Sequence, residues 1–144
     1  MLNLMRLAFT MFLLASSLCS AQNPKSKPVF DRALAEQQRG DLAAAIGDYQ
    51  EVLKLEPGLV VARINLAAAF LQLGRLDQAT DNYHLALEQE PGNLRVAVLL
   101  GNCLVLRGSF EDAIQLLRPL GKAHPQNLDI AFVLGEALIR AERL

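Results

Sequence analysis

The sequence predicts an all-α fold in which antiparallel pairs of helices stack into an array of about three and a half repeats. The chain of 144 residues contains 29 Leu and 20 Ala, both strong helix formers, but only 8 Val and 5 Ile. Three series of residues recur at intervals of 34: Pro57, Pro91 and Pro125; Gly40, Gly74 and Gly108; and Ala45, Ala79 and Ala113. Because proline and glycine are rare here, a shared period indicates internal repetition.

The first 21 residues have the three-part layout of a secretory signal peptide. Arg6 makes the start basic, residues 7–15 are apolar except for Thr10, and Cys19 and Ala21 provide the small side chains that signal peptidase accommodates. We therefore expect cleavage after Ala21 and an exported protein, periplasmic or secreted. An uncleaved amphipathic helix or a short membrane anchor is the alternative interpretation.

After a short lead at 22–25, the repeats are expected at 26–59, 60–93 and 94–127, with a partial repeat at 128–144. In the second repeat, apolar residues at helical spacing predict helices over 60–73 and 76–89. Gly74 separates the two helices and Pro91 ends the second. In the third repeat, Pro119 falls inside the second helix, so we expect a kink or an early end near Arg118.

The partial repeat is expected to form a first helix that has no second helix to pack against. Apolar residues are spread round 128–144, so one face can pack on the third repeat while the rest stays uncovered. We expect this helix to dimerise, to aggregate, or to continue into further sequence.

Residue size at repeated positions predicts how the helices pack. Ala33, Ala67 and Gly101 are small where the two helices of one repeat must approach closely. Three large side chains, expected to fill the gap between one repeat and the next, recur at the same interval of 34: Tyr49, Tyr83 and Leu117.

Composition argues against several classes of function. The net charge of −1 offers no basic excess for nucleic acid, and no run of about 18 apolar residues predicts a membrane span. His84 and His124, the only histidines, belong to different repeats, and His84 is expected on the outer face in water. No catalytic motif or phosphate-binding loop is present, so we expect no enzyme activity, no cofactor and no metal. After cleavage a single cysteine, Cys103, would remain, and it is expected to be a buried hydrophobic residue.

The repeated residues resemble the tetratricopeptide repeat (TPR) family, whose 34-residue unit pairs two helices. The first repeat is weaker, because Arg32 and Glu36 stand where the family has apolar residues. The matching residues are Ala45-x₃-Tyr49 and Pro57; Leu66-Ala67-x₂-Phe70, Ala79-x₃-Tyr83 and Pro91; Leu100-Gly101-x₂-Leu104, Ala113-x₃-Leu117 and Pro125; and Leu134-Gly135-x₂-Leu138.

The resemblance implies a right-handed superhelix whose concave groove, lined by the first helix of each repeat, binds a peptide or helix of another protein. It places twelve residues in that groove: Phe30, Leu34, Val61, Ile64, Ala68, Leu71, Arg95, Val98, Asn102, Val105, Phe132 and Ile139. Since few of them are charged, the expected partner is an apolar or amphipathic protein segment. A carboxylate clamp used by part of the family is matched only by Asn65 and Arg95, with Phe30, Leu34 and Leu99 at its other positions.

These features predict a non-catalytic interaction module or scaffold outside the cytoplasm. Two alternatives remain open: the N-terminal adaptor region of a larger exported enzyme or assembly factor, and an array that associates with itself through 128–144. The fold alone does not choose between them, because it hosts many unrelated roles.

Overall fold

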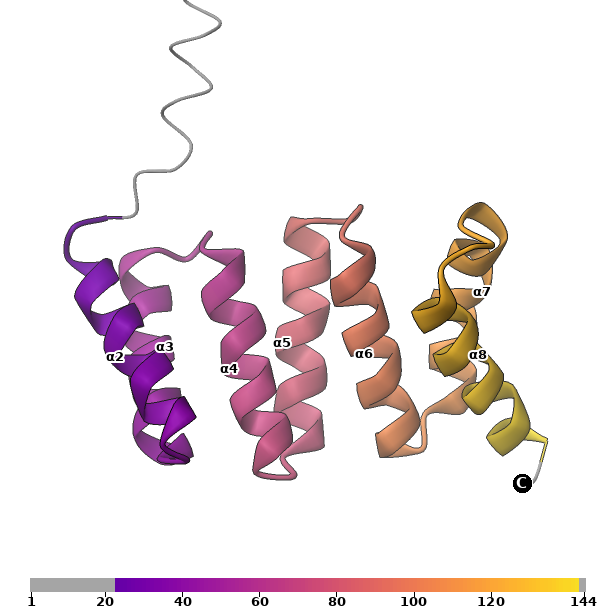
Figure 1. The fold of residues 1–144 in the computed structure, drawn as a ribbon, viewed down its shortest axis with the longest axis horizontal. Helices are drawn as coiled ribbons and strands as arrows, with labels where there is room; N and C mark the ends of the chain where they lie inside the picture. Colours follow the sequence, from indigo (N-terminus) through magenta and orange to yellow (C-terminus); the bar gives the residue numbers. More distant parts are fainter. Residues whose placement is uncertain (1–22, 143–144) are drawn as a thin grey trace, which may run out of the picture.

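The computed structural model describes residues 23–142, so the predicted signal peptide at 1–21 lies outside the described residues. Seven helices make up most of this part of the chain, and consecutive helices pack against each other. Figure 1 shows them as a row of helix pairs, with α3 behind α2 at one end and α7 behind α8 at the other. The helices are α2 (Ser26–Gln38), α3 (Leu42–Leu55), α4 (Val60–Gln72), α5 (Leu76–Gln89), α6 (Leu94–Arg107), α7 (Phe110–Ala123) and α8 (Leu128–Ala141).

This architecture confirms the predicted all-α array of about three and a half repeats. The first helix of each pair begins at Ser26, Val60, Leu94 or Leu128, and these starts are 34 residues apart. The helices of the second repeat match the predicted bounds, except that α4 ends one residue early, at Gln72.

Left-handed glycines make the turn inside each pair, as predicted. Gly40, Gly74 and Gly108 have φ angles of 82°, 71° and 86°, a conformation that residues with a Cβ rarely adopt. At the next turn, the side chains of Asn93 and Asn127 accept the amide hydrogens of Val96 and Ile130, which caps α6 and α8.

The core follows the predicted alternation of small and large residues. Ala45, Ala79 and Ala113 have no exposed surface, while Tyr49, Tyr83 and Leu117 are at most 1% exposed. Burial raises the pKa of the Tyr83 hydroxyl to about 12, because the ionised phenolate would lose its hydration. Of the glycines in 23–142, Gly101 has the closest neighbour, since an added Cβ would lie 2.6 Å from Cδ1 of Leu117.

The first repeat replaces an apolar contact with an ion pair. Arg32 lies on the exposed side of α2, and its Nη2 donates to Oδ1 of Asp48 on α3 at 2.7 Å. The hydrogen bond from Arg32 holds the pKa of the Asp48 carboxyl below its ordinary value. Arg32 and Glu36, the two polar residues that weaken the sequence pattern, both belong to α2. This helix lies at an end of the row and has no preceding repeat within the described residues.

The expected early end of α7 near Arg118 is wrong, because the helix continues through Pro119 to Ala123. Proline removes the amide that would bond the carbonyl of Gln115, four residues earlier. Both residues are exposed, so water can satisfy the freed carbonyl and the helix can continue.

Candidate functional site

The first helices of the second, third and fourth pairs carry matching residues along one side, which we call the first-helix face. On each helix these residues are spaced by three and then four positions, so they share a side of the helix. They are Val61, Ile64 and Ala68 on α4, Arg95, Val98 and Asn102 on α6, and Asp129, Phe132 and Glu136 on α8. Their 34-residue spacing places equivalent side chains on successive helices of the row.

The twelve residues predicted to line a groove differ in accessibility. Val61, Arg95, Asn102, Phe132 and Ile139 are exposed, and Leu34, Ile64, Ala68, Leu71 and Val98 are half-buried. Among the three exposed hydrophobic residues of the set, the exposed fraction is highest at Phe132, at 72%. The remaining two residues, Phe30 and Val105, are buried.

Phe30 and Val105 are thus core residues, and we remove them from the predicted groove. The Phe30 ring packs edge-on against Tyr49, with ring centroids 5.9 Å apart. Val105 is only 1% exposed. Its helix, α6, contacts the next first helix, α8, as well as α5 and α7, which leaves less of its surface free.

Two basic residues of the first helices are paired with carboxylates of the same helix. Lys27 Nζ lies 2.7 Å from Asp31, and Arg140 Nη2 lies 2.8 Å from Glu136. Arg95 is exposed and makes no ion pair with any residue in 23–142. The first-helix face therefore offers an incoming anion little unpaired positive charge.

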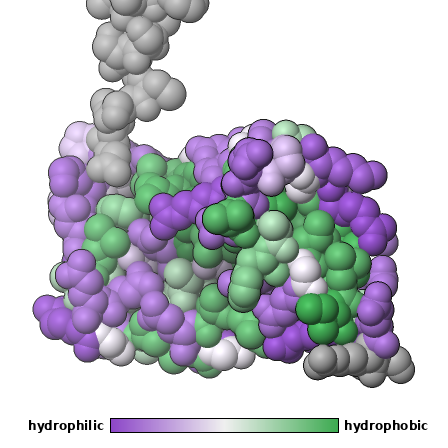
Figure 2. Space-filling model, turned by 45° about the vertical axis from the view of Figure 1, so that its right-hand side comes forward, coloured by the Kyte–Doolittle hydropathy of each residue, from purple (hydrophilic) through white to green (hydrophobic). Residues whose placement is uncertain are grey.

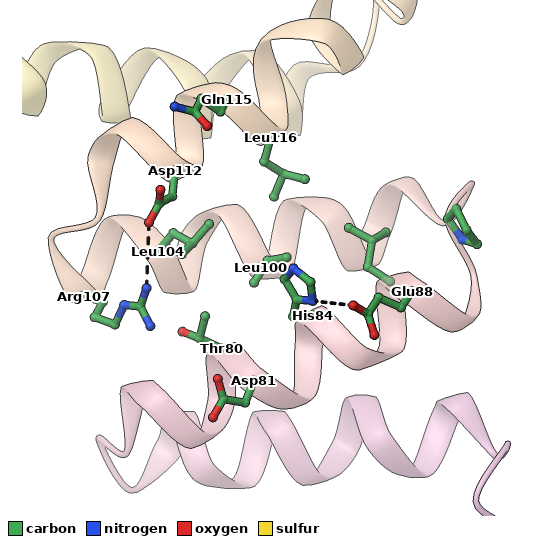
Figure 3. Close-up of a pocket in the computed structure, with 12 residues that line it drawn as sticks. Thr80, Asp81, His84, Glu88, Leu100, Leu104, Arg107, Asp112, Gln115 and Leu116 are labelled. Carbon is green, nitrogen blue, oxygen red and sulfur yellow. Dashed lines mark ion pairs between the residues drawn. The ribbon is translucent and has the colours of Figure 1, made fainter.

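The structure also has a cleft that was not predicted from the sequence. A cleft of about 730 Å³, which we call the α5–α7 cleft, lies over α6 between those two helices (Figure 3). Leu100 and Leu104 of α6 form its floor, with Leu87 and Leu116 at the sides. No sequence pattern marks this cleft, because its walls come from three helices whose separation depends on how the pairs are tilted.

Charged pairs border the α5–α7 cleft. His84 Nδ1 lies 3.3 Å from Glu88, and Arg107 lies 4.0 Å from Asp112 (Figure 3). Outside the cleft, Arg107 also lies 3.6 Å from Asp77. His84 is exposed to water, as predicted. All of these charged side chains except that of Arg107 are more than half exposed, so the pairs contribute little to stability.

Cys103 is the buried hydrophobic residue that the sequence predicted. Its sulfur is fully buried, 3.5 Å from the Thr80 hydroxyl, and burial raises the pKa of the thiol. Among residues 23–142, no group of three His, Cys, Asp or Glu side chains is arranged to hold a metal. No described helix combines the length and the apolar character required to cross a bilayer.

Comparison with known proteins decides the family. The model of the tetratricopeptide repeat matches residues 36–81 and 78–127, which is more than half of the chain. The chain belongs to the tetratricopeptide repeat family. Among curated proteins, none matches it significantly.

Solved TPR structures share the fold at low sequence identity. MamA (41-end) from Desulfovibrio magneticus RS-1 is 20% identical with a TM-score of 0.78, over 85% of this chain and 70% of that one. The first TPR of Spaghetti (RPAP3), bound to the HSP90 peptide SRMEEVD, is 16% identical with a TM-score of 0.74, over 86% of this chain and 98% of that one. The Sgt2 TPR domain from Aspergillus fumigatus is 20% identical with a TM-score of 0.72, over 85% of this chain and 82% of that one.

Proposed function

We propose that this TPR protein is a non-catalytic interaction module that binds an extended or helical segment of another protein along the first-helix face. The observation that carries this proposal is the repetition of accessible, mostly uncharged side chains on three successive first helices. Repeated side chains at a constant spacing can contact successive residues of one bound segment. Two structural neighbours are described with bound ligands of this type, the RPAP3 domain with an HSP90 peptide and a yeast Sti1 domain with pHsp70.

The partner segment is apolar or amphipathic. Val61 and Phe132 present hydrophobic surface, with half-buried Ile64 and Val98 between them. The peptide bound to the RPAP3 domain contains two Glu and one Asp. Here Lys27 and Arg140 are already paired with Asp31 and Glu136, so an acidic tail would have to compete with these internal carboxylates.

The chemistry of the titratable groups is consistent with a role in binding. Tyr49, Tyr83 and Cys103 have raised pKa values because they are packed in the core, away from solvent. Groups buried for packing have no access to a substrate. We also propose that the protein acts outside the cytoplasm, on the evidence of the signal-peptide layout of 1–21.

A pair of matched substitutions tests the binding face. Val61 on α4 and Leu85 on α5 are 44% and 43% exposed, so a glutamate at either position should leave the fold intact. Peptides would be selected from a phage-displayed random library, and their affinity measured by fluorescence anisotropy. We expect Val61→Glu to weaken binding by about tenfold or more, because it places an unpaired charge against apolar ligand surface. Leu85→Glu should leave the affinity unchanged.

Circular dichroism of both variants checks that helicity is retained, and a salt series tests the chemistry of the ligand. The affinity should change little with ionic strength, because few charges take part. Equal loss of binding in both variants would contradict the location of the site. Selection of strongly acidic peptides whose binding falls steeply with salt would contradict the proposed partner.

A further inference from the structure

One face of α8 has the form of a helix-packing surface but is uncovered. Gly101 of α6 faces Leu117 of α7 so closely that a Cβ there would lie 2.6 Å from the leucine. Gly135 occupies the equivalent position of α8, and a Cβ there would meet nothing within 4 Å. Among residues 23–142, no helix stands against α8 where α7 stands against α6.

Neighbouring positions show the same contrast. Ala97 and Val105 of α6 are each 1% exposed, whereas their equivalents on α8 are an exposed Ala131 and an Ile139 that is 54% exposed. A shallow hollow beside Gly135 is lined only by residues of α8, including Phe132 and Ile139. Figure 2, in which the right-hand side of Figure 1 comes forward, shows hydrophobic residues on this end of the molecule.

We infer that a second copy of this chain covers this face, with the two α8 helices antiparallel about a two-fold axis near Gly135. Charge complementarity argues for this occupant and orientation. Asp129 lies in the first turn of α8 and Arg140 in its last turn, about 16 Å apart along the axis. An antiparallel pair brings Asp129 of each copy opposite Arg140 of the other, so that Arg140 lies between that Asp129 and Glu136 of its own chain, whereas a parallel pair would place like charges together.

Side-chain sizes also suit close approach of two identical helices. Ala131 and Gly135 are four residues apart, so they lie one turn apart on the same side and let the helix axes come within about 8 Å. Phe132 of each copy then enters the hollow between Gly135 and Ile139 of the other, so in the dimer α4 and α6 are the part of the first-helix face that stays accessible to a peptide. Glu136 falls near the two-fold axis, where its charge is balanced by Arg140 of its own chain at 2.8 Å.

Sedimentation equilibrium of the purified protein tests this dimer, at concentrations up to about 0.5 mM because small interfaces are weak. A concentration-dependent dimer is expected, with or without the residues that precede Gln22. Gly135→Gln should raise the dimer dissociation constant by about tenfold or more, since its side chain blocks the close approach. Gly47→Gln is the matched control, because Gly47 is likewise a glycine inside a helix with nothing within 4 Å of a Cβ, and it lies on α3 rather than α8.

Charge variants test the orientation. Asp129→Lys and Arg140→Asp should each weaken self-association, because each brings like charges together across the two-fold axis. Mixing the two variants should restore association, since the mixed dimer has opposite charges at both contacts. A protein that stays monomeric, a Gly135→Gln variant that dimerises like the wild type, or a failure of mixing to restore association would each overturn the proposal. Gly135 is not one of the residues of the first-helix face, so measuring Val61-dependent peptide binding in Gly135→Gln separates failure of the dimer from failure of the peptide site.

Discussion

Residue size is most tightly constrained at Gly101, where the two helices of the third repeat meet. Cδ1, Cγ and Cδ2 of the buried Leu117 side chain lie 2.6, 3.1 and 3.3 Å from the position of an added Cβ, so rotation about the Cβ–Cγ bond cannot relieve the contact because Cγ stays in place. We expect Gly101→Ala to lower the free energy of unfolding by about 1–2 kcal/mol, although alanine favours a helix by about 1 kcal/mol. Urea denaturation followed by circular dichroism measures this change.

Gly47→Ala is the control, and it should raise stability by about 0.5–1 kcal/mol because nothing opposes the added methyl group. Combining Gly101→Ala with Leu117→Ala should destabilise the protein less than the sum of the single changes, because the second change makes room for the first. An additive result, or a stabilising Gly101→Ala, would mean that the Gly101–Leu117 contact does not limit the approach of the helices.

The requirement for a small residue at 101 could be predicted from the sequence, since Ala33 and Ala67 stand at the equivalent positions. The exposure of the residues predicted to line the groove could not be predicted from the sequence. Leu71, Val105 and Ile139 are 34 residues apart, yet they are half-buried, buried and exposed in turn. Periodicity assigns the same side of the helix to all three, whereas their exposure depends on the helices packed against each.

At the scale of the helix, α7 tolerates a proline whose missing amide leaves the Gln115 carbonyl to water. Pro119→Ala should restore that backbone hydrogen bond. It also gives the unfolded chain more conformational entropy, so the expected net rise in the free energy of unfolding is about 1–2 kcal/mol. Thermal and urea unfolding measure the gain. Pro125→Ala, in the turn after α7, should bring no gain. A neutral or destabilising Pro119→Ala would show that α7 is shaped around its proline.

Helix boundaries were predictable because glycine and proline mark them chemically in every repeat. The left-handed glycines at 40, 74 and 108 and the prolines at 57, 91 and 125 lie between helices, as expected. The continuity of α7 was not predictable, because it depends on which side of the helix Pro119 occupies in the folded array. The α5–α7 cleft was missed for a related reason, since it depends on the distance between two helices that are not consecutive.

At the scale of the whole molecule, the signal-peptide layout of 1–21 predicts that the protein is located outside the cytoplasm. Expression in a bacterial host followed by fractionation and N-terminal sequencing should recover an exported protein that begins at Gln22. Ala21→Phe should leave the leader attached, because a large side chain does not suit the cleavage site. Recovery of the full-length wild-type chain from the cytoplasm would contradict export.

The regular spacing of the helix starts also bears on how such a chain can change in length. Because each helix packs mainly on the helices next to it, a tandem duplication of one 34-residue unit would create a copy whose two boundaries match the existing ones. The added unit would extend the first-helix face by one helix and leave α2 and α8 at the ends. Recombination can therefore lengthen the first-helix face by one helix at a time, because each added unit forms the same contacts between repeats that the chain already has.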